Sequence, residues 1–184
     1  MPGQTYLNLF ELAAEQFGYF TAAQARAWGV EPNALVMMER RGTLERLSHG
    51  VYRFVHFPTS PLGQYMEASF WPGATRAVIS HESALALHGV SDVSPARIHL
   101  SVPRKWRTHR SVPRHLALHR ADVPPAEVDS VEGIPVTTLE RAITDCARAH
   151  LGPDLIGQAI EEGRQAGRLS RSVAARLKST LLAA

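Results

Sequence analysis

Glycine residues divide the first 55 residues of this chain into short segments, and this division constrains the fold more than any other feature of the sequence. Gly18, Gly29 and Gly42 each follow a helical pattern, and Gly50 lies between two short apolar runs. Glycine adopts the left-handed conformation that helix ends and tight turns require. We therefore expect several short elements joined by tight turns.

The first helical pattern ends at Gly18. Its apolar residues recur with the spacing i, i+4, i+7, i+8 and i+11, which places them on one face of a helix. These residues are Tyr6, Phe10, Ala13, Ala14 and Phe17. We expect this face to pack against the core of an N-terminal domain.

Two more helices are predicted before Gly42. Thr21 and Gln24 have the spacing of a capping box, in which each side chain bonds the other residue's backbone N–H, so a short helix begins there. Pro32 suits the first position of a third helix, since its missing N–H costs nothing at that position. Leu35 and Met38 lie three residues apart on this helix and would face the core.

A two-stranded hairpin is predicted after the third helix. Its strands are the runs 44–47 and 51–54, and Ser48-His49-Gly50 forms the tight turn between them. Helix, short helix, turn, helix and hairpin is the order of a winged helix-turn-helix. We expect this domain to occupy residues 1–56, and the proline-containing run VHFPTSP after Phe54 reads as a linker.

A winged helix binds DNA by placing its third helix in the major groove and its wing on the neighbouring backbone or minor groove. Asn33 would read a base edge, most naturally adenine, and the arginines would pair with phosphates. The residues expected to face DNA are Asn33, Ala34, Val36, Met37, Arg40 and Arg41 of the helix, and Arg46, His49 and Arg53 of the wing.

A protein-interaction role is the alternative for this domain. Five glutamates balance the five arginines of residues 1–55, so the sequence does not predict a strongly basic face. Val36 and Met37 are apolar where a DNA reader more often carries polar or basic groups. They would contact either thymine methyl groups or the surface of a protein partner.

Residues 62–184 are expected to form a second domain with mixed α and β patterns, which makes the whole chain α+β. The segments 97–102 and 115–120 alternate between apolar and polar residues, as half-buried strands do. Further short strands are predicted at 77–79 and around Ile134 and Val136, with helices at 62–71, 81–89, 138–150, 154–164 and 171–182. Thr137 and Glu140 have the spacing of a second capping box.

Positive charge is concentrated in one segment of this second domain. Residues 97–121 contain seven arginines and lysines and no acid, whereas the whole chain carries a net charge of only +3. The proline-flanked loop 103–114 holds Arg104, Lys105, Arg107 and Arg110 around Trp106. These cations could contact a phosphate backbone while the indole stacks on a base. A solvated hairpin loop and an acidic protein partner are the alternatives.

Several patterns that resemble catalytic or metal sites lack the required spacing. His81 and His88 are seven residues apart, whereas a zinc-binding helix needs histidines at i and i+4, so His81 is assigned a structural or capping role. Ser80 and Ser83 lie beside His81 without a nucleophile elbow, and no glycine-rich phosphate loop is present. We therefore expect neither enzyme activity nor a metal or cofactor, and we expect the single Cys146 to be a buried, inert thiol.

The chain is expected to be cytoplasmic. Its N-terminus has no basic region followed by an apolar stretch, so it does not read as a signal peptide. No apolar run reaches the roughly 18 residues that a membrane span needs, so no membrane association is expected.

Five stretches of the sequence resemble the AbiEi family, the antitoxin and transcriptional-regulator components of type IV toxin–antitoxin systems. In the N-terminal part these are GYFTAAQARAWGV at 18–30 and RRGTLERLSHGVYRF at 40–54. In the second part they are AVISHESALALHGVSDVSPARIHLSVP at 77–103, LHRADVP at 118–124 and VEGIPVTTLERAITDCAR at 131–148. The resemblance covers nearly the whole chain, and the order of the motifs is more specific than any one of them.

The resemblance implies a repressor that binds double-stranded DNA at inverted repeats in its own operator, as a monomer or as a dimer induced by DNA. It implies a functional link to a nucleotidyltransferase-type toxin, which is counteracted without a stable protein complex. It also implies that the second domain carries antitoxin activity and adds to DNA binding through a basic surface. Carried over to this chain, the resemblance adds Thr21 and Gln24 to the DNA-contact positions.

Overall fold

The computed structural model describes residues 3–73 and 76–182, and it divides the chain into two compact units, Met1–Ala77 and Val78–Ala184. This division falls later than the boundary expected from the proline-containing run at 55–61. Phe57 packs against the core of the first unit, and Arg53 donates hydrogen bonds to the carbonyl oxygens of Phe57 and Pro58. The run that reads as a linker is thus held onto the first unit.

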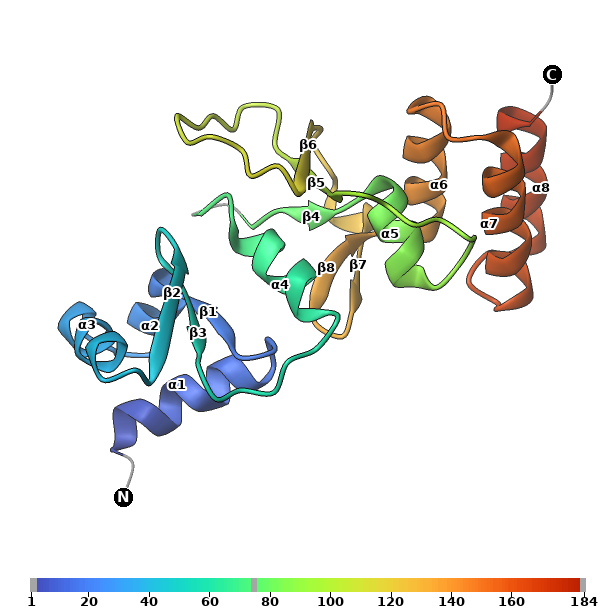
Figure 1. The fold of residues 1–184 in the computed structure, drawn as a ribbon. Helices are drawn as coiled ribbons and strands as arrows, with labels where there is room; N and C mark the ends of the chain where they lie inside the picture. The colour runs from blue at the N-terminus through green and yellow to red at the C-terminus, as the bar shows by residue number, and fades with distance from the viewer. Residues whose placement is uncertain (1–2, 74–75, 183–184) are drawn as a thin grey trace. The chain divides into compact units, whose positions relative to one another are not determined.

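The first unit is a winged helix with a three-stranded antiparallel sheet in the order β1-β3-β2 (Figure 1). Its elements are α1 (Gln4–Ala14), β1 (Tyr19–Thr21), α2 (Ala22–Ala27), α3 (Pro32–Arg40), β2 (Leu44–Ser48), β3 (Val51–Phe54) and α4 (Gly63–Phe70). The predicted helices and hairpin are confirmed. Strand β1 was not predicted, because three residues are too few to show a period of two.

The predicted face of α1 is only partly correct. Ala13 is fully buried and Tyr6 packs against the core, as predicted, whereas Phe10 is 39% exposed and Ala14 is exposed. Phe10 packs at the edge of an aromatic group, with its ring 5.5 Å from that of Phe54. Leu9, which the predicted face did not include, is fully buried and forms an i, i+4 pair with Ala13.

The second unit is built on a five-stranded mixed sheet in the order β6-β5-β4-β8-β7. Its elements are β4 (Val78–Ile79), α5 (His81–His88), β5 (Ile98–Val102), β6 (Leu116–Arg120), a 3-10 turn η1 (Pro125–Glu127), β7 (Val128–Val131), β8 (Ile134–Thr137), α6 (Leu139–Arg148), α7 (Pro153–Gln165) and α8 (Arg171–Leu181). The pairs β5–β6 and β4–β8 are parallel, while β4–β5 and β7–β8 are antiparallel. The predicted fold class, a winged helix followed by a unit of mixed α and β elements, is confirmed.

Two local details of the second unit differ from the prediction. The N-cap of α6 is Thr138, whose side chain accepts a hydrogen bond from the N–H of Arg141, and Thr137 is instead the last, fully buried residue of β8. Strand β7 was missed because VDSV has little apolar character. The turn at Glu132 and Gly133, with φ angles of 49° and 77°, joins β7 to β8 in the conformation of a tight hairpin.

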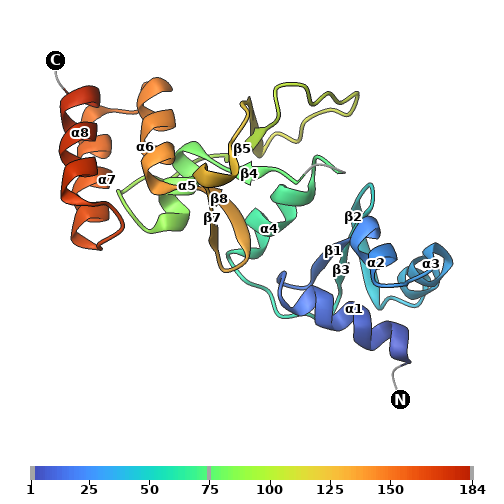
Figure 2. The ribbon, with the colours of Figure 1, turned by 180° about the vertical axis from the view of Figure 1, so that it is seen from behind.

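Helices α6, α7 and α8 stand side by side at one end of the second unit (Figure 2). Gly163 of α7 permits the close approach of α6, because a Cβ at this position would lie 2.6 Å from Cδ2 of Leu139. Cys146 of α6 is 1% exposed, and burial raises the pKa of its thiol to about 12. The burial of this thiol, expected from the sequence, is thereby confirmed, and a raised pKa disfavours the reactive thiolate.

None of the helices within residues 3–73 and 76–182 has both the length and the apolar character that a bilayer crossing requires.

Gly18 and Gly29 provide a matched test of how the first unit is packed. Both have a left-handed backbone, with φ angles of 86° and 77°, but a Cβ at Gly18 would lie 2.6 Å from the Cβ of Phe57, while nothing lies within 4 Å at Gly29. We expect Gly29→Ala to lower the free energy of unfolding by about 1 kcal/mol from backbone strain alone. Gly18→Ala should cost about 1–3 kcal/mol more because of overpacking. Urea denaturation of the full chain measures both, and equal losses would contradict the packed position of Phe57.

Candidate nucleic-acid interface

Helix α3 presents a continuous exposed face on the first unit. Leu35 is 3% exposed, and Ala34 and Met38 pack against the core on the same side of the helix. The outward position predicted for Ala34 is therefore wrong. At 100° per residue, the opposite side is formed by positions 33, 36, 37 and 40. The side chains of Asn33, Val36, Met37 and Arg40 are all exposed, as the sequence predicts.

The start of α2 is fixed by a capping box. The Thr21 hydroxyl accepts from the Gln24 N–H at 3.1 Å, and Gln24 Oε1 accepts from the Thr21 N–H at 2.8 Å. The Gln24 amide nitrogen donates to Oε1 of Gln16 at 2.9 Å. The polar atoms of Thr21 and Gln24 are therefore used inside the fold. The structure favours a positioning role for both residues, rather than the DNA contact that the family resemblance implied.

Arg41 follows α3 and lies at the edge of its exposed face. Together with Met37, it lines a depression of about 420 Å³ between α3 and the first turn of α1. Arg40 and Arg41 end the helix, where positive charge also complements the helix dipole. Both arginine side chains are exposed.

The wing exposes two of its three predicted residues. Arg46 and His49 are exposed and approach each other at 3.5 Å across the turn between β2 and β3. Arg53 faces the other way: its guanidinium bonds the carbonyl oxygens after β3 and lies over the ring of Tyr19, 5.5 Å from its centre. Arg53 is thus engaged within the fold and is removed from the exposed wing surface.

The basic loop of the second unit is a crossover and not a hairpin loop. Because β5 and β6 are parallel, residues 103–115 run from the end of one strand back to the start of the next, and the loop extends away from the sheet (Figure 1). The solvated hairpin considered above is therefore wrong in its geometry. Arg104, Lys105 and Arg107 are exposed, and Arg110 is half-buried.

Hydrogen bonds within the loop limit what its side chains can reach. The Arg104 N–H donates to Oδ1 of Asp122 at 3.0 Å, which ties the start of the loop to the residues after β6. Nη1 of Arg107 donates to the carbonyl oxygens of Arg104 and Trp106 at 2.6 and 2.9 Å. Trp106 is half-buried. Arg104 and Lys105 are thus the more accessible cations of this loop.

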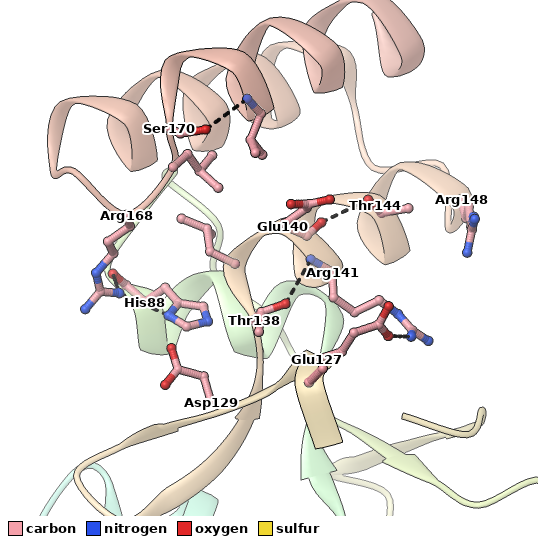
Figure 3. Close-up of a pocket in the computed structure, with 14 residues that line it drawn as sticks. His88, Glu127, Asp129, Thr138, Glu140, Arg141, Thr144, Arg148, Arg168 and Ser170 are labelled. Atoms are coloured by element: carbon pink, nitrogen blue, oxygen red, sulfur yellow. Dashed lines mark hydrogen bonds and ion pairs between the residues drawn. The ribbon is translucent and has the colours of Figure 1, made fainter. Parts of the chain in front are cut away.

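A separate pocket of about 770 Å³ opens in the second unit beside α6 (Figure 3). Figure 3 shows Arg168 beside His88, which bonds the Thr137 carbonyl oxygen at 2.8 Å through Nε2. The guanidinium of Arg141 forms ion pairs with the carboxylates of Glu127 and Asp145, the latter at 2.8 Å. The lining carries three arginines and three carboxylates. Sequence reasoning did not find this pocket, because its residues come from segments up to 85 positions apart.

His81 and His88 serve different parts of the second unit, as their spacing predicts. His88 lies in the pocket just described, whereas His81 packs against His99 and His119 of the sheet. Burial lowers the pKa of His81 to about 3 and also lowers the pKa values of His99 and His119. The grouping of these three rings was not predicted, although the alternating pattern had placed His99 on the polar side of its strand.

Comparison with known proteins identifies both units. Residues 8–55 match the family model described as "Transcriptional regulator, AbiEi antitoxin", and residues 76–157 match the "AbiEi antitoxin C-terminal domain". A search of the curated proteins found no match. Among solved structures, the chain is similar to the RV2827C protein from Mycobacterium tuberculosis, with 17% identity, a TM-score of 0.50, and coverage of 98% of this chain and 73% of that chain. This last likeness concerns the fold alone.

The two matched models lie in the chain order that the sequence motifs predict, and together they span most of the chain. Their descriptions are those of regulators and not of enzymes, in agreement with the sequence analysis. The chain belongs to the AbiEi family of antitoxins and transcriptional regulators.

Proposed function

We propose that this regulator is a DNA-binding repressor of its own operon and the antitoxin of a type IV toxin–antitoxin system. The observation that carries the proposal is the exposed face of α3, which is held outward by the buried side chain of Leu35. An α-helix presented in this way fits the major groove of B-DNA. Asn33 stands at the N-terminal end of the face and Arg40 at its C-terminal end.

The proposed contacts follow from which side chains remain exposed. Asn33, Val36 and Met37 would face base edges, and Arg40 and Arg41 would bind phosphates beside the groove. The wing and the loop would add phosphate contacts through Arg46, His49, Arg104, Lys105, Arg107 and Arg110. Thr21, Gln24 and Arg53 would contribute by holding the helix and the wing in place.

The toxin link is proposed from family membership. A regulator that represses its own operon sets the supply of both gene products, and the family resemblance implies a nucleotidyltransferase-type toxin counteracted without a stable complex. If the repressor dimerises on inverted repeats, the half-sites should be separated by about one helical turn, 10–10.5 base pairs. Footprinting of the upstream region measures this spacing directly.

Arg40 and Arg41 test the contribution of α3. We expect the double variant Arg40→Gln, Arg41→Gln to weaken binding to the upstream region of its own gene. Each lost phosphate contact reduces the slope of log K against log salt by about 0.9, so the slope should fall by about two units. Fluorescence anisotropy over a salt series measures the slope.

The control for this variant is Arg171→Gln, Arg176→Gln, which makes the same charge change on exposed positions of α8. It should leave the slope near that of the wild type. If the slope is unchanged in the Arg40 and Arg41 variant, or is reduced equally in both variants, then α3 does not contact the DNA.

Arg104 and Lys105 test whether the second unit adds to DNA binding. Because their side chains are exposed, the variant Arg104→Gln, Lys105→Gln should lower affinity and reduce the salt slope by up to about two units. Extending the variant to Arg107 and Arg110 should add less, since Arg107 bonds the loop itself. Undiminished affinity would leave the loop as a solvated segment.

A protein-docking role is the second candidate, and one observation favours it. Val36 and Met37 are 41% and 44% exposed, so two large apolar side chains lie next to each other on the outer face of α3. If this face docks on a protein, the double variant Val36→Ser, Met37→Ser should abolish binding to that protein. The wild-type chain should then give no mobility shift with its own upstream region. If the face binds DNA, the same variant should weaken the mobility shift of the wild type.

A further inference from the structure

Three histidines of the second unit meet on one side of the sheet, two of them from adjacent strands and one from the start of α5. His99 lies on β5 and His119 on β6, two positions apart in the parallel register, because Ser101 is the partner of His119. His81 begins α5 directly after β4, and the N–H of Ser80 donates to the carbonyl oxygen of His99 at 3.0 Å. The topology therefore brings together residues that are 18 and 20 positions apart in the sequence.

The ring nitrogens of this histidine cluster lie close to one another. Nε2 of His119 is 3.1 Å from Nδ1 of His99, and the rings of His81 and His119 stack with their centres 3.6 Å apart. One nitrogen from each of the three rings lies within 4.8 Å of the other two. His81 is buried, while His99 and His119 are half-buried, so one side of the cluster faces solvent.

The backbone at His81 is held in an unfavourable conformation. Its φ angle is 54°, in the left-handed region, which costs a residue with a Cβ about 1–2 kcal/mol. The hydroxyl oxygen of Ser80 is 3.0 Å from Nδ1 of His81. This hydrogen bond orients the ring and leaves Nε2 as the nitrogen available to a ligand. Backbone strain of this kind concentrates at functional sites, where the geometry of one side chain matters more than local stability.

We propose that His81, His99 and His119 form a binding site for a divalent first-row transition-metal ion, with Zn²⁺ as the fitting ion. Two nitrogen ligands of one tetrahedral zinc, each about 2.05 Å from the metal, are separated by about 3.3 Å. The His99–His119 separation of 3.1 Å already matches this value. The rings of His81 and His119 are stacked at an interplanar angle of 16°, so His81 has to turn out of this stack to direct Nε2 at the same ion. Solvent then takes the fourth position on the open side.

The three imidazoles themselves have to supply the affinity for the ion, because the charges that act on the cluster are mostly positive. Metal ligation uses the deprotonated ring, and burial lowers the pKa values of all three histidines. Arg97 and Arg141 act on the cluster as positive charges, and Asp145 acts on His119 as a negative one. Asp145 is bonded to Arg141 at 2.8 Å, so we leave it out of the ligand set.

Occupation of this site would link the end of β4 to β5 and β6. The last two strands flank the basic loop at 103–115, so the ion would stabilise both strands at the base of that loop. Because the ion binds only the folded sheet, the midpoint of thermal unfolding should rise with ion concentration. This expectation is independent of whether α3 binds DNA.

The test uses the untagged full-length chain, stripped with a chelator and then titrated with Zn²⁺ in a calorimeter. We expect one equivalent to bind, and Co²⁺ in its place should give the visible absorption of a tetrahedral or five-coordinate nitrogen site. Long-range ¹H–¹⁵N spectra of the wild type should show ring nitrogens of three histidines shifting together. This measurement needs no variant, so it does not depend on how a substitution affects folding.

The variants His99→Ala and His119→Ala should each weaken Zn²⁺ binding by more than tenfold and remove the Co²⁺ spectrum. His115→Ala is the matched control, because this exposed histidine lies just before β6 and outside the cluster. Zn²⁺ binding that is unaffected by both cluster variants, or spectral shifts confined to exposed histidines, would overturn the proposal. So would the absence of any bound ion at concentrations that saturate ordinary three-histidine sites.

Discussion

The burial of Leu35 is the interaction on which the presentation of α3 depends. The helix has only nine residues, and an isolated helix of this length is marginal in water. Its stability and its direction therefore come from the side that docks on the core, where Leu35 belongs to the same buried cluster as Val30 and Ala25 of the preceding turn and helix. The same docking fixes which side chains face outward, so the candidate interface is a consequence of the packing of one leucine.

The second unit depends on a different constraint, the parallel pairing of β5 with β6. A parallel pair cannot be joined by a short turn, so the chain must return along the length of the sheet before β6 begins. Here that return carries the basic residues, and no helix of its own covers them. The pairing also places His99 and His119 two positions apart in the register of neighbouring strands, so one topological feature positions both the basic loop and two members of the histidine cluster.

Local patterns predicted much of this fold. The capping box at Thr21, the glycines that end α2, α3 and α5, and the alternation at 97–102 are all set by neighbouring residues, and the structure contains each of them. Features that depend on residues far apart were beyond the sequence. The direction of β6 is one example, since the alternation of apolar residues is the same in parallel and antiparallel strands.

The candidate site shows the same division. Periodicity identified the outward residues of α3, because burial of Leu35 and Met38 determines the opposite face. It could not show that Arg53 donates a hydrogen bond to the Phe57 carbonyl oxygen. Nor could it show that the polar atoms of Thr21 and Gln24 are hydrogen-bonded to each other in the capping box. The pocket beside α6 and the histidine cluster were hidden for one reason: their residues converge only when the strands of the sheet are ordered.

The central claim, that the exposed face of α3 enters duplex DNA, is tested most directly by amide chemical shifts of the full chain during titration with a duplex from its own upstream region. The account predicts that the largest shifts fall on residues 33–41 and on the turn at 48–50, and that a duplex of unrelated sequence gives smaller ones. Shifts that leave α3 unchanged while the duplex binds, or a duplex that does not bind at all, would contradict it.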